Sequence, residues 1–232
     1  MTRTLWQFVD RALSSTTTVY AACAASLALG LSFIFVWSPL PWGWQGIDFY
    51  YEIALSLARG EPFPTMHLVW GYAYFLAFWY WLFGDHQWVP LTAQAVLNAT
   101  IPLMLYHLVR IELGARIGVM AAVLAGLLSF NTIYASTQAS DSVCTVLVMA
   151  TMLCLSAGRA RRRPALFVVA GVLAGVSFQF RPNFVLFPFF FAALYLLLRP
   201  KPRLNLGQGI RQMTVFVLAF VLTAMPWVVR NY

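Results

Sequence analysis

The chain has 232 residues, of which 61% are hydrophobic and only 9% are charged. A soluble globular domain carries roughly 25% charged residues, so this composition excludes that class. The formal net charge is +8, but the basic residues stand in short clusters between apolar runs. This distribution is typical of cytoplasmic loops and argues against nucleic-acid binding. The three cysteines lie inside apolar runs without CxxC spacing, which indicates buried thiols rather than a disulfide framework or a metal site.

Several apolar runs approach the roughly 20 residues that a helix needs to cross a bilayer. In chain order they cover residues 19–37, 68–83, 89–109, 117–134, 143–157, 166–178, 184–198 and 213–229. Because a helix satisfies its backbone hydrogen bonds internally, these runs predict an all-α, polytopic transmembrane protein. Arg3 and Arg11 precede the first run, which is too long for a signal-peptide core and is interpreted as an uncleaved signal anchor. The whole chain, 1–232, is expected to form a single transmembrane module.

The basic residues indicate how many of the runs cross. If all eight crossed, the cluster at 159–163 would face the opposite side from the amino-terminal arginines, against the positive-inside rule. The run 68–83 is short and rich in aromatic rings, so we interpret it as a re-entrant or interfacial helix on the outer side. About seven spans remain, with a cytoplasmic amino terminus. The expected inner basic residues are Arg3, Arg11, Arg110, Arg116, Arg159, Arg161, Arg162, Arg163, Arg199, Lys201, Arg203 and Arg211.

The first outer loop, residues 38–88, contains the leading catalytic candidate. Apolar residues recur at helical spacing over 47–59, which predicts an amphipathic surface helix that stops at Gly60. Asp48 lies in its first turn, Glu52 one turn later, and Arg59 closes the same face. Placing an acid at the edge of a membrane is costly, so Asp48 is a candidate for chemistry. Helix capping explains Asp48 equally well when it is taken alone.

Other polar residues are expected on the same outer side. Asp141 begins the span at 143–157, where helix-start chemistry competes with a functional role. Arg181 lies between two spans, and it suits either a snorkelling interfacial arginine or a bidentate partner for phosphate. His67 precedes the interfacial helix and could donate to a phosphate or a hydroxyl, although a structural role is at least as well supported.

A series of short motifs resembles the GT-C class of polyprenyl-phosphate-sugar glycosyltransferases. Within that class, the chain is most similar to bacterial relatives of the protein O-mannosyltransferases and the aminoarabinose transferase of lipid A. The matching pieces, in chain order, are residues 48–60, 70–77 and 82–84, Asp141, the Phe180, Arg181, Pro182 element and residues 226–232. Each piece is short, and their order and spacing carry the resemblance.

The resemblance implies an integral enzyme of the bacterial inner membrane whose active face is extracytoplasmic. A sugar would move from a polyprenyl-phosphate donor to a lipid, glycan or protein acceptor, with inversion and with Asp48 as the general base. Arg181, helped by Arg59 or Arg230, would neutralise the leaving phosphate. Asp141 would orient the acceptor or hold a cation, since some members of the class use Mg²⁺ or Mn²⁺. Glu52 and His67 complete the expected substrate-binding set.

Two other readings stay open at this point. Relatives continue beyond the equivalent of Tyr232, so the chain resembles an amino-terminal module that a second subunit could complete. It could then be a non-catalytic subunit that binds the lipid carrier, or a degenerate copy. A transporter is less favoured, because transporters place ionisable groups near the midplane of their spans and these runs contain almost none.

Overall fold

The computed structural model describes residues 15–37, 50–63, 69–128, 130–198 and 205–231. These residues form helices and no strand, which confirms the all-α prediction. The α-helices are α2 (Thr16–Ser32), α3 (Tyr50–Ala58), α4 (Gly71–Phe83), α5 (Trp88–Asn98), α6 (Ile101–Leu113), α7 (Ala115–Leu128), α8 (Phe130–Tyr134), α9 (Ser140–Ala160), α10 (Ala165–Phe180), α11 (Phe187–Leu198) and α12 (Leu206–Asn231). A π-helical turn, Phe33–Trp37, extends α2, and a 3₁₀ turn, Pro182–Phe184, follows α10.

Four helical segments in the described part of the chain are long and apolar enough to cross a membrane. They are Thr16–Trp37, Trp88–Leu113, Ser140–Ala160 and Leu206–Asn231. Three further apolar segments, Ala115–Leu128, Ala165–Phe180 and Pro182–Leu197, are shorter than a usual span. The protein is therefore an all-α membrane protein, and the number of about seven crossings stays a prediction.

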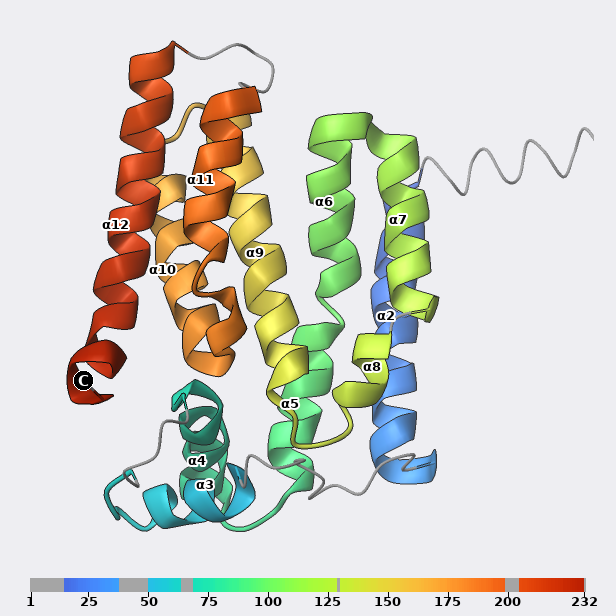
Figure 1. The fold of residues 1–232 in the computed structure, drawn as a ribbon. Coiled ribbons are helices and arrows are strands. Elements are labelled where there is room, and N and C mark those ends of the chain that lie inside the picture. Colours follow the sequence, from blue (N-terminus) through green and yellow to red (C-terminus); the bar gives the residue numbers. More distant parts are fainter. Residues whose placement is uncertain (1–14, 38–49, 64–68, 129, 199–204, 232) are drawn as a thin grey trace, which may run out of the picture.

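The long helices run between the two ends of a bundle (Figure 1). Successive passes through α2, α5–α6, α7–α8, α9, α10, α11 and α12 alternate in direction. By contrast, α3 and α4 lie together at the lower end in this view, below α10. The interpretation of α4 as a re-entrant or interfacial helix stays a prediction.

Small residues allow the helices to pack closely. A Cβ atom added to Gly171 would lie 2.3 Å from the carbonyl oxygen of Phe216, and one added to Gly175 would lie 2.5 Å from Cβ of Thr223. Both glycines are on α10 and face α12, so the backbones of these two helices approach each other as in other membrane bundles. Gly126 of α7 approaches the carbonyl of Ala22 of α2 in the same way, at 2.6 Å.

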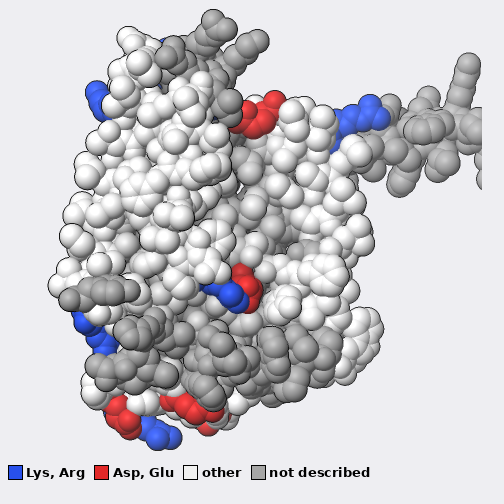
Figure 2. Space-filling view, viewed as in Figure 1, with Lys and Arg blue, Asp and Glu red and all other residues white. Residues whose placement is uncertain are grey.

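Most charged residues in Figure 2 lie near the top and the bottom of the molecule, and one acid–base pair lies between them on this face. Following the helix directions, the described residues at the upper end are Arg110, Glu112, Arg116, Arg159, Arg161, Arg162, Arg163 and Arg211. The lower end has Glu52, Arg59, Glu61, Asp85, Asp141, Arg181 and Arg230. Most described acids therefore share the end that holds α3 and α4, as the sequence predicts.

Candidate functional site

Asp141 and Arg181 form an ion pair at the lower end of the bundle. The Arg181 guanidinium donates from Nη2 to Oδ2 of Asp141. Asp141 is in the first turn of α9, where the helix dipole favours a carboxylate. Arg181 directly follows α10, and because Pro182 comes next, its backbone is extended, with φ −146° and ψ 114°. The Arg-Pro step thus ends α10 and directs the arginine side chain toward the start of α9.

The pair is open to its surroundings. About a third of each side chain is exposed, 35% for Arg181 and 39% for Asp141. In Figure 2 an acid and a base touch in a hollow of the surface, where α9 begins and α10 ends in Figure 1. A small molecule can therefore reach these two charges without rearrangement of the bundle.

Several buried polar atoms beside the pair lack a hydrogen-bond partner. Among the described residues, these include Nε of Arg181, Oγ of Ser140, Oγ of Ser142 and Oε1 of Gln138. Buried polar groups in folded proteins are nearly always satisfied, because an unpaired group loses its hydration without compensation. These atoms are buried, so they are polar groups that the protein itself leaves unsatisfied around the ion pair.

Helix α4 packs directly behind this site. A Cβ atom at Gly71, the first residue of α4, would lie only 2.6 Å from the carbonyl oxygen of Gln179. The ring of Tyr72 contacts Phe180 edge to face at 6.1 Å, and Phe75 meets the same ring at 6.4 Å. Close approach of α4 therefore fixes the end of α10, and with it the position from which Arg181 extends.

A buried hydrogen-bond network connects α4 to the segment before Asp141. The Tyr72 hydroxyl donates to Oε1 of Gln94. Nε2 of Gln94 in turn donates to the carbonyl oxygens of Ala135 and Thr137, at 3.3 and 3.0 Å. Further along, Nε2 of Gln138 donates to the hydroxyl of Tyr80 at 2.8 Å. The chain from 135 to 140 is buried throughout, so these bonds anchor the approach to α9.

The two α4 tyrosines of this network are neutral at physiological pH. Burial raises the pKa of Tyr72 and Tyr80 above the ordinary value, and the neighbouring tyrosine hydroxyls add to the effect. A phenol that keeps its proton remains a hydrogen-bond donor. The hydrogen bonds that these two hydroxyls donate or accept are therefore unchanged over the physiological pH range.

The first outer loop is described only in part. Asp48, the predicted base, and His67 lie outside the described residues. The predicted surface helix is confirmed as α3, which buries Tyr50 and Ala54 and exposes Glu52. It ends before Gly60, whose φ of +83° suits the helix stop. Arg59 lies exposed just beyond α3, so the structure places it and Glu52 at the lower end.

Arg230 has a structural setting. Its guanidinium donates to the carbonyl oxygen of Phe63 at 2.7 Å and lies over the rings of Phe63 and Trp70, at 5.0 and 5.6 Å. These contacts join the end of α12 to the segment between α3 and α4. The structure thus brings two of the predicted substrate-binding residues, Asp141 and Arg181, together, and it uses Arg230 to hold neighbouring elements in place.

An apolar groove of about 460 Å³ lies between α4 and α5. Its lining residues are Trp79, Phe83, Trp88, Val89, Thr92, Ala93, Val96 and Leu97. Ring contacts lead from this groove toward the ion pair, since Trp79 meets Phe75 at 6.4 Å and Phe75 meets Phe180, the residue before Arg181. A series of packed rings therefore connects the groove to the residue before Arg181.

The described residues of the site do not by themselves form a set of ligands for a divalent cation. Asp141 is the acid expected to hold a cation, and it is paired with Arg181. Among the described residues there is no group of three histidine, cysteine, aspartate or glutamate side chains that could hold a metal ion. The arrangement instead offers a guanidinium with neutral hydroxyl and amide groups around it, which suits an anion with polar substituents.

A comparison with family models matches residues 70–228 to the family described as dolichyl-phosphate-mannose-protein mannosyltransferase. The chain belongs to this family. Membership confirms the resemblance to the GT-C class and supports a membrane glycosyltransferase of that type. The matched region runs from the start of α4 almost to the end of α12, so it contains both Asp141 and Arg181. Neither the comparison with curated proteins nor that with solved structures found a match.

Sequence reasoning missed the residues that support the pair. Gln94 and Gln138 are fully buried and their hydrogen bonds organise the approach to α9, yet neither was singled out. The position of Gln94 inside the apolar run 89–109 was a usable signal, because a glutamine that is buried there must find a hydrogen-bond partner. What the sequence did not supply was the identity of that partner, which comes from a distant helix.

Proposed function

We propose that the chain transfers a sugar from a polyprenyl-phosphate donor to an acceptor at the extracytoplasmic face. The lower end of the bundle, with α3 and α4, would be this face. The observation that carries the proposal is the partly exposed guanidinium of Arg181, held in place by its ion pair with Asp141. An arginine that is oriented by a carboxylate and still has exposed N–H groups is suited to bind a phosphate.

The proposed reaction is an inverting displacement at the anomeric carbon. The acceptor oxygen or nitrogen forms a bond to this carbon while the bond to the phosphate oxygen breaks, and its electron pair stays on the phosphate. Asp48, which the sequence favours as the base, takes the acceptor proton. Arg181 stabilises the charge that develops on the leaving phosphate. Asp141 orients that guanidinium, and Glu52 with Arg59 completes the substrate-facing set.

The groove between α4 and α5 is the proposed place for the isoprenoid tail. Its wall is apolar and aromatic, and packed rings at Phe75 and Phe180 link it to the element that carries Arg181. A tail in the groove would therefore lie on the helix, α4, that packs against the end of α10. Val96 projects from α5 into the groove wall and is half exposed, so a larger side chain there would narrow the space for a tail.

The test uses the purified chain reconstituted in proteoliposomes with a labelled polyprenyl-phosphate mannose. The measurement is transfer of label to the lipid and protein fractions, with the anomeric configuration of the product read by NMR. Asp48→Asn should abolish transfer, while Asp85→Asn, the same change at another acid of the lower end, should leave it intact. Full activity of Asp48→Asn would refute the assigned base.

A second variant separates the tail groove from the chemistry. Val96→Trp should raise the KM for a long-chain donor and leave the KM for a donor with a very short tail unchanged, because only the long chain occupies the groove. If wild-type protein binds the donor but never consumes it, the alternative of a non-catalytic lipid-carrier-binding subunit gains support instead.

A further inference from the structure

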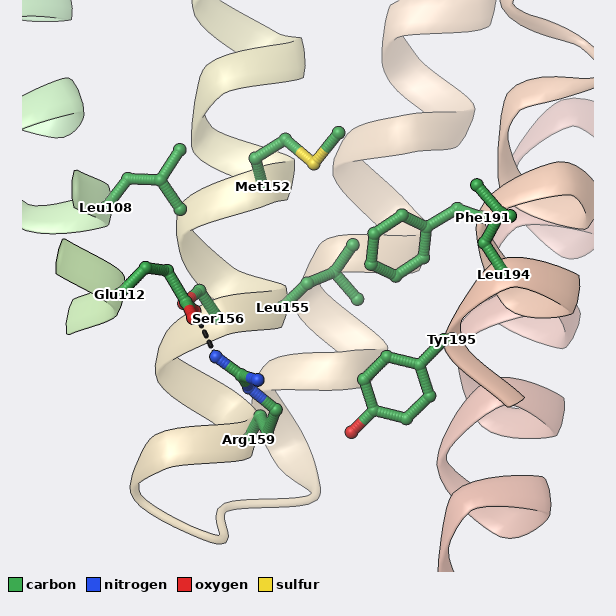
Figure 3. A pocket seen from close by; sticks show the side chains of 9 residues that line it. All are labelled: Leu108, Glu112, Met152, Leu155, Ser156, Arg159, Phe191, Leu194 and Tyr195. Atoms are coloured by element: carbon green, nitrogen blue, oxygen red, sulfur yellow. Dashed lines mark hydrogen bonds and ion pairs between the residues drawn. The ribbon is translucent and has the colours of Figure 1, made fainter. Parts of the chain in front are cut away.

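A second cavity lies at the opposite end of the bundle from the Asp141–Arg181 pair. It measures about 310 Å³ and is formed where α6, α9 and α11 face one another (Figure 3). Its apolar wall consists of Leu108, Met152, Leu155, Phe191 and Leu194. The proposed transfer reaction uses none of these residues, so this cavity requires a separate explanation.

The end of the cavity that lies toward the last turn of α9 is polar. Arg159 forms an ion pair with Glu112, and the hydroxyl of Ser156 donates to Oε1 of Glu112 at 2.6 Å (Figure 3). The Arg159 side chain is only 10% exposed, against 41% for Glu112. Burying a guanidinium so deeply is costly without a partner, so the pair keeps this charge in place at the end of the apolar wall.

The turn that follows Arg159 adds positive charge without matching acids. Arg161, Arg162 and Arg163 are all exposed in the short turn between α9 and α10. Arg162 has a φ of +52°, a left-handed conformation that costs a residue with a side chain about 1 kcal/mol or more. Glycine adopts that conformation without this cost, yet the position holds a cation. Arg159 lines the cavity and is paired with Glu112, so the three exposed arginines that follow it in sequence add unpaired positive charge to this end of α9.

The apolar wall and the basic residues at one end together restrict what can occupy the cavity. A free anion would gain nothing from the apolar wall. A molecule with a hydrocarbon chain and an anionic head group would use both parts, and basic pockets between helices at a membrane surface bind such lipids.

We propose that this cavity binds a membrane phospholipid with an anionic phosphate head group. One acyl chain would lie along Leu108, Met152, Leu155, Phe191 and Leu194, and the phosphate would contact the arginine turn at 161–163. The site lies at the far end of the bundle from Arg181, and it does not depend on the sugar-transfer proposal. It would retain a lipid whether or not the chain is an active enzyme.

Lipid binding to the purified protein in detergent tests the proposal, with phosphatidylglycerol as the probe and native mass spectrometry as the readout. Leu108→Trp should abolish saturable binding, because the indole fills the cavity. Leu218→Trp, the same change at an exposed site on α12, is the matched control and should bind as wild type does. Equal binding by Leu108→Trp and wild type would overturn the proposed chain site.

The head-group contact has its own variant. Arg162→Gly should weaken phosphatidylglycerol binding about fivefold, as expected for one surface cation, without lowering the melting temperature, because it removes the left-handed strain. Loss of both binding and stability would indicate a merely structural role for the turn and would refute the contact. Phosphatidylcholine should bind more weakly than phosphatidylglycerol, and equal binding would also refute it. Competition by inorganic phosphate at millimolar concentration would point to a free-anion site and would overturn the lipid assignment.

Discussion

Replacing Arg181 with glutamine should separate stability from catalysis at the Asp141–Arg181 pair. With 35% and 39% of the two side chains exposed, their coupling should resemble that of partly solvated ion pairs, about 1 kcal/mol. For a chain of this size, that free energy corresponds to a fall in melting temperature of about 2–4 °C. The effect on catalysis should be larger than the effect on stability. Loss of a charge-assisted contact to the leaving phosphate should lower kcat about 10²- to 10³-fold.

The measurement combines thermal unfolding in detergent with the proteoliposome transfer assay on four proteins. These are wild type, Arg181→Gln, Asp141→Asn and the double variant. Both single variants should melt about 2–4 °C lower, and the double variant no lower than either, because each change breaks the same ion pair. Activity should fall at least about 100-fold in Arg181→Gln and about tenfold in Asp141→Asn, which keeps the guanidinium but loses its orientation.

The control is Arg211→Gln, an exposed arginine on α12 at the upper end of the bundle. It should leave both the melting temperature and transfer unchanged. The reasoning fails if Arg181→Gln transfers sugar at the wild-type rate. It also fails if the activity of the variants simply follows their melting temperatures, since the pair would then only hold α9 against α10.

Two further predictions concern α4. Gly71→Ala should lower the free energy of unfolding by about 1–3 kcal/mol, because the added Cβ would lie 2.6 Å from the carbonyl oxygen of Gln179 and α4 would have to shift. Thermal unfolding measures this loss. An unchanged melting temperature would contradict the close approach of α4 to α10. The second concerns alkaline pH. The folded-state pKa values of Tyr72 and Tyr80 are raised, so the unfolded chain loses these protons first, and stability should be constant below about pH 10 and fall above it. In thermal melts recorded from pH 8 to 11, the melting temperature of Tyr80→Phe should fall less steeply with pH than that of wild type. If both proteins lose melting temperature equally with pH, the burial of this phenol is not linked to folding.

The sequence predicted those features of the fold that depend on local pattern. Apolar runs defined the helices, and the asymmetry of charge correctly separated an arginine-rich end from an acidic one. The short aromatic run at 68–83 was expected to differ from the spans, and α4 indeed lies at one end of the bundle. These inferences succeed because hydropathy and helical periodicity act over neighbouring residues.

Contacts between distant segments were beyond the same reasoning. Asp141 and Arg181 were each proposed separately, but their ion pair depends on how α9 packs against α10, 40 positions apart. Arg230 was expected to bind substrate, and its aromatic partners could not be known until α12 was placed beside Phe63 and Trp70. Periodicity says which face of a helix is buried, but not which neighbour covers it.

The bonds of Gln94 bear on how the protein is assembled during membrane insertion. This side chain joins Tyr72 to the backbone at Ala135 and Thr137, so it connects segments that leave the ribosome more than 60 residues apart. When α4 and α5 have been inserted, Nε2 of Gln94 therefore lacks these two acceptors until the segment before α9 has been synthesised. The ion pair that follows closes still later, when Arg181 has been synthesised. The proposed site thus forms only after α10 has been synthesised. An insertion intermediate that lacks α10 would not contain a complete site.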